Sequence, residues 1–174
     1  MFNLKNKVAV ITGSRRGIGR GIAEVFAKAG ANVVISDVDQ KESEQTARQI
    51  SAKYKVKALA IRCDVSKKSD VDSLLRQTVK KFKKVDILVN NAGIFPSQPA
   101  LTMTLELWEK IQMINLRGTF LCCREVGNLM AKAGKGSIVN IASIDALHPS
   151  MAGLAAYDAS KHGVWGFTKN FALE

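Results

Sequence analysis

Short apolar runs that alternate with amphipathic stretches constrain the fold of this chain more than any other feature. Each run is continuously apolar, as in strands whose sheet is covered on both faces. Repeated strand–helix units imply right-handed crossovers and therefore a parallel sheet. The predicted strands are 8–12, 33–36, 58–61, 87–89 and 138–141, and the predicted helices are 17–29, 40–53, 67–83, 104–133 and one from 155 toward 174. The sequence thus predicts an α/β fold with a doubly wound parallel sheet between two helical layers.

The chain has the size and composition of one globular domain. Its 174 residues are 47% hydrophobic, which suffices for a single core. No internal repeat, low-complexity segment or linker divides it, so we expect residues 1–174 to form one domain. The apolar runs are too short to cross a bilayer, and residues 1–5 lack the apolar core of a secretory signal. We expect a cytoplasmic protein that does not engage membranes.

Cysteine and histidine usage argues against a disulfide framework and against a metal site. Cys63, Cys122 and Cys123 form no Cys-x-x-Cys pair and lie among apolar residues, as buried reduced thiols do. The two histidines, His148 and His162, have no second ligand at a recognisable spacing. We expect no bound metal.

The net charge of +11 raises the alternative of a nucleic-acid or acidic partner. The densest cluster comprises Lys80, Lys81, Lys83 and Lys84. These lysines interrupt an amphipathic helical pattern and have no interleaved aromatic residues that could stack bases. We therefore interpret them as the solvated face of a helix and expect no nucleic-acid partner.

A glycine-rich loop follows the first predicted strand and opens directly into a helix. Glycines there allow a tight turn and a close approach of the backbone to a pyrophosphate, which the helix N-terminus attracts. Asp37 ends the second strand, near the offset of about 20 residues expected for a ribose-binding carboxylate. The Lys-Ser or Lys-Thr of a P-loop is missing. The sequence predicts a dinucleotide site whose loop residues are Gly13, Ser14, Arg16, Gly17, Ile18 and Gly19.

Asp37 and Arg16 favour different dinucleotides. The Asp37 carboxylate can accept hydrogen bonds from a ribose 2′-hydroxyl and would repel a 2′-phosphate, which favours NAD. Arg16 could pair with that phosphate, but Arg15 and Arg16 could equally be solvated loop residues. Since Val38 rather than a basic residue follows Asp37, we favour NAD, with NADP as the alternative.

A second loop, residues 93–99, contains two prolines, which exclude regular structure. It follows a predicted strand, and in such sheets ligands lie beyond the carboxyl ends of the strands. We expect this loop to border the site.

Tyr157 and Lys161 stand four residues apart in a predicted helix and so share one face. A free phenol has a pKa of about 10, and a cation within roughly 4–6 Å can lower it by about 1–3 units. A tyrosine tuned in this way can act as a general acid or base. The spacing alone also occurs in ordinary helices, so the interpretation depends on the other motifs.

Together these features resemble the short-chain dehydrogenase/reductase family, from about Lys5 to the last residue. The loop from Thr12 to Gly19 is similar to the family motif Thr-Gly-x-x-x-Gly-x-Gly. Further family motifs match in the same order: Asp64-Val65 beside the adenine, the turn Asn90-Asn91-Ala92-Gly93, Asn115, Ser143, and the pair Tyr157 and Lys161. The resemblance implies a Rossmann-like fold in which these residues, with Asp37, hold the cofactor or act in catalysis.

The resemblance also implies an activity, namely hydride transfer between a nicotinamide and a carbonyl or secondary alcohol. Tyr157 would protonate the carbonyl oxygen and Ser143 would hydrogen-bond it. Lys161 would hold the nicotinamide ribose and lower the tyrosine pKa, and Asn115 would anchor a water that links Lys161 to solvent. Family members usually form homotetramers through the helices that carry Asn115 and Tyr157.

Two narrower hypotheses stay open beside this one. Arg16 and the basic surface would suit a 3-oxoacyl carrier-protein reductase that uses NADPH, although Asp37 weighs against it. A dinucleotide-binding module without turnover is the alternative of another class. His148, Trp165, Cys122 and Cys123 are interpreted as packing or pocket-wall residues.

The chain departs from the family pattern in two places. The spacing from Ser143 to Tyr157 is one residue longer than the commonest one. The chain also reaches Glu174 inside an amphipathic pattern without a helix stop signal. Family members continue with two more strands and a substrate-covering lid, so we expect an N-terminal portion of a longer enzyme whose substrate the sequence does not identify.

Overall fold

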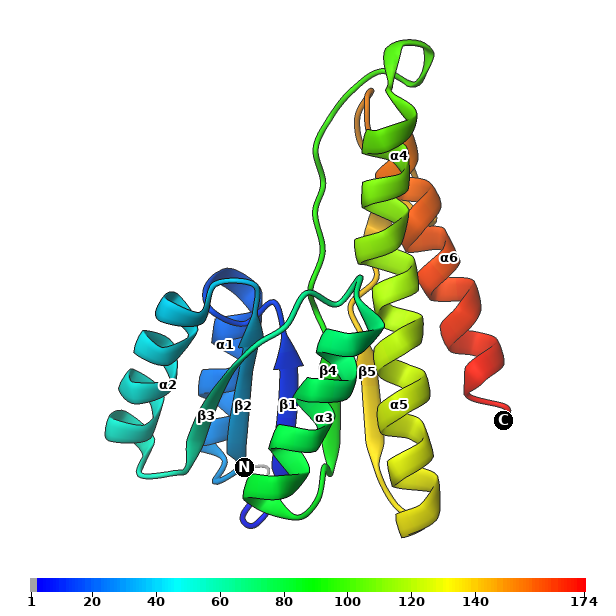
Figure 1. The fold of residues 1–174 in the computed structure, drawn as a ribbon. Coiled ribbons are helices and arrows are strands. Elements are labelled where there is room, and N and C mark those ends of the chain that lie inside the picture. Colours follow the sequence, from blue (N-terminus) through cyan, green and yellow to red (C-terminus); the bar gives the residue numbers. More distant parts are fainter. Residues whose placement is uncertain (1–2) are drawn as a thin grey trace.

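A computed structural model describes residues 3–174 and contains one parallel sheet of 5 strands. The strand order is β3-β2-β1-β4-β5, so the chain starts in the middle of the sheet, builds one half outward and then returns to build the other half (Figure 1). This arrangement confirms the predicted doubly wound fold. The strands are β1 Val8–Thr12, β2 Asn32–Asp37, β3 Ala58–Arg62, β4 Ile87–Asn90 and β5 Ser137–Asn140.

Helices cover both faces of the sheet, which explains why the strands are continuously apolar. The central strand β1 sends Ala9 and Ile11 into a cluster with α1 and α2, and sends Val10 into a cluster with α3 and α5. Successive side chains of a strand point to opposite faces, and here both faces are core. The helices are α1 Gly17–Lys28, α2 Gln40–Tyr54, α3 Lys68–Phe82, α4 Leu105–Gln112, α5 Gly118–Ala133 and α6 Ala155–Phe171.

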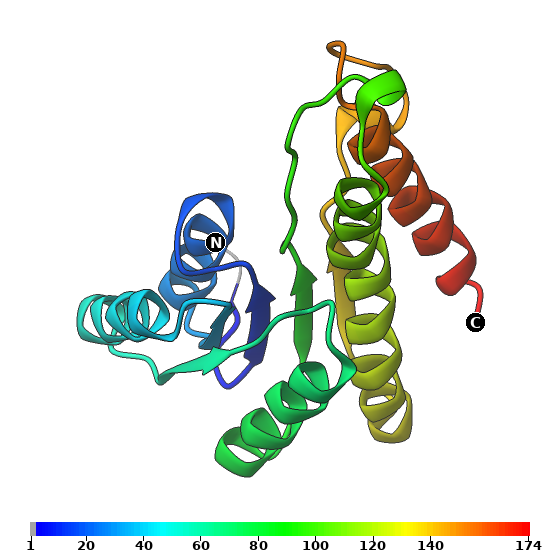
Figure 2. The ribbon, with the colours of Figure 1, turned by 45° about the horizontal axis from the view of Figure 1, so that its top comes forward.

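The helix predicted as continuous over 104–133 is interrupted. A π-helical segment, Met113–Arg117, lies between α4 and α5, although the three pieces form one long rod beside α6 (Figure 2). A π-helical turn accommodates an extra residue and is frequent at functional sites. It carries Asn115, whose side chain bonds outside the rod, as described below. The prediction of one regular helix was wrong at this point.

The connections after β4 and β5 contain little regular structure. Residues 91–99 are irregular, as the two prolines predicted, and lead to a short 3₁₀ turn, Ala100–Thr102. A second 3₁₀ turn, Ile144–Ala146, follows β5. Along residues 3–174 no helix is both long and apolar enough to cross a membrane.

The three cysteines are free and buried, as predicted. Burial raises the pKa of Cys63 to about 12 and that of Cys123 to about 11. These thiols are therefore protonated near neutrality and belong to the packing. Within the described residues, no group of three or more potential metal ligands comes together.

Candidate active site

The carboxyl ends of the strands enclose a hollow of about 300 Å³. In an open parallel sheet this edge is where ligands bind, at the point where the strand order reverses between β1 and β4. Segments far apart in the sequence meet here: the loop after β1, the end of β2, the turn after β3 and the loop after β4. The lining residues are Gly13, Arg15, Arg16, Asp37, Val38, Cys63, Asp64, Val65, Asn91, Ala92, Gly93, Ile94 and Ile114.

The glycine loop brings its backbone close to the β4 loop and then starts α1. Gly13 has φ +63°, and a Cβ there would meet the Cα of Ala92 at 2.7 Å. Neither the backbone conformation at this position nor the space beside Ala92 therefore accommodates a side chain. Gly17 begins α1 with open space around it. The preceding Arg16 gives no side-chain cap to the helix. The N–H groups at the start of α1 therefore have no capping side chain and suit an anion.

Asn91 ties the glycine loop to the β4 loop. Its side-chain amide donates to the backbone carbonyls of Thr12 and Gly13 at 3.0 and 2.9 Å. In return, the Thr12 hydroxyl accepts from the N–H groups of Asn91 and Ala92, both at 3.1 Å. Four hydrogen bonds thus fix one wall of the hollow against the other.

Some predicted cofactor residues lie outside the lining and support it. Ser14 is fully buried, and its hydroxyl donates to Ile11 O at 2.6 Å and accepts from Ser36 N at 3.1 Å, which joins β1 to β2. Asn90 is buried and donates to Cys123 Sγ at 3.2 Å and to Asn140 Oδ1 at 2.8 Å. Gly17, Ile18 and Gly19 form the first turn of α1.

Asp37 ends β2 at the hollow and is held by Arg15. The Arg15 guanidinium lies 3.1 Å from the Asp37 carboxylate, 3.0 Å from Glu42 and 3.7 Å from Asp39, while Arg15 N–H donates to Asp37 at 3.2 Å. Three carboxylates share one guanidinium. The sequence left Arg15 undecided between pairing with a phosphate and lying in a solvated loop. In the structure Arg15 binds carboxylates instead, and the acidic residues Asp37, Asp39 and Glu42 were the sequence signal for that role.

Asp64 and Val65 line the hollow after β3. One Asp64 oxygen accepts from both the N–H and the hydroxyl of Ser66, at 3.1 and 2.7 Å, which shapes the turn. Asp64 N–H donates to Asp70 at 3.1 Å. Val65 also packs against Gly118, where a Cβ would meet its side chain at 2.7 Å, so α5 fits closely under this turn.

Asn115 joins three segments at the inner end of the hollow. Its amide oxygen accepts from Ile94 N–H and its amide nitrogen donates to Ile94 O, both at 2.9 Å. The same nitrogen donates to Ser160 Oγ at 3.0 Å. Asn115 therefore fixes the proline-containing loop to α6, and the π-helical segment is what presents its side chain to both.

Lys161 and Tyr157 lie on successive turns of α6, as their spacing predicted. Lys161 is buried, its Nζ donates to Ile141 O at 2.7 Å, and it lies 5.8 Å from the centre of the Tyr157 ring. No carboxylate pairs with it in the described structure, and burial lowers the pKa of Lys161. Phe95 meets the Tyr157 ring edge-on at 6.1 Å, a wall contact that the sequence interpretation did not single out.

Ser143 follows β5, and its hydroxyl is engaged by Asp145. The hydroxyl donates to the Asp145 carboxylate at 2.9 Å and accepts from Asp145 N–H at 3.2 Å. Hydrogen bonds from Ser150 and Ser143 lower the pKa of Asp145, whereas burial and the charge of Asp145 raise the pKa of Asp158. Ser143 thus caps the 3₁₀ turn after β5, and this turn packs on α6.

His148 and Trp165 do not line the hollow. His148 is exposed in the loop after β5, and Trp165 lies on an exposed part of α6, where its ring meets His162 edge-on at 5.5 Å.

Fold and site together define a doubly wound α/β protein with a hollow at the carboxyl edge of its parallel sheet. The chain matches a family model described as "short chain dehydrogenase" over residues 7–174 and belongs to that family. Members of this family are oxidoreductases that use NAD(H) or NADP(H).

Several relatives match along nearly the whole chain. A 3-oxoacyl-[acyl-carrier-protein] reductase of Synechocystis sp. is 39% identical, with 100% of this chain and 70% of the relative covered. An NAD-dependent glycerol dehydrogenase of Listeria innocua is 36% identical, with 99% and 66% covered. Among solved structures, a short-chain type dehydrogenase/reductase of Mycobacterium marinum matches with a TM-score of 0.95 and 35% identity, over 99% of this chain and 70% of that one.

Proposed function

We propose that residues 1–174 form one dinucleotide-binding and catalytic domain that transfers hydride between NAD and a carbonyl or secondary alcohol. The observation that carries the proposal is the continuity of the carboxyl-edge hollow. It runs from Gly13 and Arg16, beside the uncapped start of α1, past Asp37 to Gly93 and Ile94. Ile94 N–H donates to Asn115, and a Cβ added at Gly93 would lie 3.7 Å from Lys161 Nζ. The proposed pyrophosphate site and the lysine proposed to assist proton transfer would thus lie at the same edge of the sheet.

The residues present fit a dinucleotide. The start of α1 and the glycine loop would hold the pyrophosphate, since they offer uncapped N–H groups and no side chain at Gly13 or Gly17. Asp64 and Val65 would flank the adenine, and the turn from Asn90 to Gly93 would face the nicotinamide ribose. When bound, the nicotinamide supplies the hydride donor or acceptor.

Tyr157 would give its phenolic proton to the substrate oxygen during reduction and take it back during oxidation. An ammonium has three N–H donors, and Lys161 uses one on Ile141 O. The other two donors remain for the nicotinamide ribose, and the ammonium lies 5.8 Å from the centre of the Tyr157 ring. Ser143 would hydrogen-bond the same oxygen after turning away from Asp145. Asn115 would keep the Lys161 surroundings in place and support a water route to solvent.

The preference for NAD is supported by the acidic surroundings of Asp37, the residue predicted to bind the adenosine ribose. Asp37, Asp39 and Glu42 gather on the single guanidinium of Arg15. A 2′-phosphate placed there would meet three carboxylates against one cation. The Listeria relative that is named NAD-dependent is consistent with this proposal.

A carrier-protein reductase that uses NADPH is the second candidate. Arg16 lines the hollow and forms no ion pair within the described chain, so it is available to a phosphate. The Synechocystis relative carries that activity in its name. The acidic cluster at Asp37 is the observation that places this candidate second.

A cytoplasmic homo-oligomer, specifically a tetramer, is part of the same proposal. Large apolar side chains are exposed along the rod and α6: Leu105, Trp108, Phe120 and Trp165 are 75%, 40%, 40% and 38% accessible. Burial of such a face in a partner would remove it from water.

The direct test is a fluorescence titration of the chain with NADH and NADPH, followed by turnover assays with a panel of carbonyls and alcohols. We expect saturable binding with NADH tighter, and reduction of at least one carbonyl. Binding without turnover would support the non-catalytic module. Tighter binding of NADPH would favour the second candidate, and no binding of either would overturn the proposal.

A further inference from the structure

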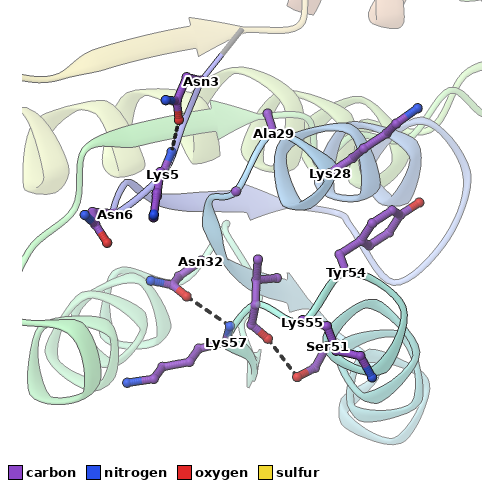
Figure 3. Close-up of a pocket in the computed structure, with 12 residues that line it drawn as sticks. Asn3, Lys5, Asn6, Lys28, Ala29, Asn32, Ser51, Tyr54, Lys55 and Lys57 are labelled. Atoms are coloured by element: carbon purple, nitrogen blue, oxygen red, sulfur yellow. Dashed lines mark hydrogen bonds between the residues drawn. The ribbon is translucent and has the colours of Figure 1, made fainter. Parts of the chain in front are cut away.

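A second hollow, of about 860 Å³, lies at the amino ends of β1, β2 and β3, on the edge of the sheet opposite to the candidate active site (Figure 3). Three segments border it: residues 3–6 before β1, the turn between α1 and β2, and the end of α2 with the turn into β3. Its lining therefore shares no residue with the cofactor hollow.

The charge of this lining is of one sign. Lys5, Lys28, Lys55 and Lys57 belong to it, all four are exposed, and none forms an ion pair within residues 3–174. No aspartate or glutamate contributes to the lining. Glu24, a carboxylate that approaches it, is paired with Arg20 at 2.9 Å.

Two lysines elsewhere along the same edge are compensated. Lys7 and Lys84 lie 3.8 and 2.9 Å from the buried carboxylate of Asp86. Burial alone would raise the pKa of Asp86, but the hydrogen bonds from Lys84 and Val8 N–H and the charges of both lysines lower it. The four lysines of the hollow have no such carboxylate, so their charges are left for a ligand.

Two neutral polar residues also line the hollow, and one of them has an unused donor. The Asn32 amide oxygen accepts from Lys57 N–H at 2.9 Å, which leaves its NH₂ group without a protein acceptor in the described chain. Ser51 donates to Val56 O at 2.8 Å and so fixes the turn that carries Lys55 and Lys57. Asn32 and Ser51 are half-buried, and they form a floor below the exposed lysine rim.

The spread of the lysines indicates the kind of anion. Lys28 extends toward one side of the hollow, and Lys5 and Lys57 lie on the other side (Figure 3). A single phosphate could meet only some of them, whereas a chain of two or three phosphates could contact several. Ammonium groups on flexible stems suit such ligands because they act as point charges without a fixed geometry.

We propose that this hollow binds a compact oligo-anion, a small ligand that carries two or more linked phosphate groups. The proposal does not rest on the redox function, because the two hollows lie on opposite edges of the sheet. Such a ligand would stabilise the folded chain by binding to it alone, and its affinity would fall with salt because the rim is exposed.

The test is calorimetric titration of the 174-residue chain with inorganic tripolyphosphate at low salt, with NADH present and absent. We expect one site per chain. The double variant Lys5→Gln/Lys57→Gln should weaken the binding of tripolyphosphate about tenfold, because each of the two exposed cations contributes a modest binding free energy. The control Lys80→Gln/Lys81→Gln removes the same charge from the exposed face of α3 and should change affinity less than about twofold. Circular dichroism checks that both variants fold.

Each other outcome overturns the proposal. Equal weakening in both variants would mean attraction by the overall charge of the protein. Displacement of tripolyphosphate by NADH would place it in the cofactor hollow. Duplex DNA that binds more tightly than tripolyphosphate and responds alike to both variants would indicate a general polyanion surface. Absence of binding at low salt would mean that the lysines are only solvated.

Discussion

The glycine loop and the segment that carries Ser143 and Tyr157 border the same edge of the sheet, but they are held in different ways. The glycine loop is fixed by hydrogen bonds that Asn91 donates to Thr12 and Gly13 and by a contact of Gly13 with Ala92 that leaves no room for a Cβ. Across from it, the Tyr157 hydroxyl has no hydrogen-bond partner within residues 3–174, and the Ser143 hydroxyl is turned to Asp145.

This difference separates the region proposed to bind the cofactor from the residues proposed to act in the chemical step. The wall proposed to bind the cofactor is built by hydrogen bonds to backbone groups of neighbouring strands and loops. Of the groups proposed to act in proton transfer, the Tyr157 hydroxyl has no hydrogen-bond partner in the described chain, and the Ser143 hydroxyl donates only to Asp145, two residues away. Exposed Ile144, Leu147 and Met151 in the intervening loop, at 68%, 53% and 59% accessible, show how little covers this side. Changes to the first region should therefore affect folding and binding together, and changes to the second should affect turnover alone.

The largest expected effect belongs to Tyr157→Phe. Loss of the acid should lower turnover by about 10²–10⁴-fold while NADH affinity and folding stay unchanged, since no protein group bonds the lost hydroxyl. Steady-state kinetics and NADH titration measure both. Tyr54→Phe on α2 removes the same atom far from the pocket and should have no effect on turnover. Equal turnover in Tyr157→Phe and the native chain would remove the tyrosine from the mechanism.

Gly19→Ala tests the packing of the glycine loop. A Cβ there would clash with Gly13 O and lie 2.5 Å from Asn91 Nδ2, so urea unfolding should show destabilisation by about 1–3 kcal/mol, with weaker NADH binding. Gly166→Ala is the matched control. It lies in α6 with open space around it, and we expect about 0.5–1 kcal/mol of stabilisation. Similar shifts in both variants would contradict the close packing of the loop.

Asp37→Asn tests the acidic ribose end. Loss of one carboxylate should reduce the preference for NADH over NADPH about tenfold, the equivalent of one charged hydrogen bond. Paired titrations of both cofactors give this ratio. Asp72→Asn on α3 removes the same charge from an exposed ion pair with Lys68 and should leave the ratio as it is. An unchanged ratio in Asp37→Asn would mean that this carboxylate does not choose the cofactor.

The smallest effect concerns the pH dependence of stability. Burial lowers the pKa of Lys161 from 10.5, so between its folded pKa and 10.5 the unfolded chain binds more protons, and stability should rise with pH. Lys161→Met lacks this titration. Urea unfolding from pH 7 to 10 should show the native chain gaining stability relative to the variant as pH rises. Parallel curves would mean that Lys161 is not desolvated.

The sheet was predictable because its strands are continuously apolar and the helices between them are amphipathic, so local pattern and tertiary burial agree. The π-helical segment was not predictable, because residues 104–133 carry no local break. Asn115 lies in this segment and bonds to Ile94 and Ser160, contacts that exist only in the folded chain.

The same contrast between local pattern and tertiary placement explains which parts of the site could be predicted. Motif spacing predicted that Asp37, Gly13 and Asn91 would meet at the hollow, because the carboxyl ends of parallel strands share an edge. The lysine-lined hollow is assembled from turns whose mutual placement no local pattern encodes. Charge density along the sequence pointed instead to residues 80–84.

Isotope transfer measures whether this chain moves hydride with Tyr157 as the acid. NADH dideuterated at the nicotinamide C4 is incubated with a carbonyl that the chain reduces, and the alcohol is analysed by mass spectrometry. We expect one deuterium on the former carbonyl carbon with the native chain, and almost no product with Tyr157→Phe in the same time. An alcohol without deuterium, or equal labelled product from Tyr157→Phe, would refute the proposed function.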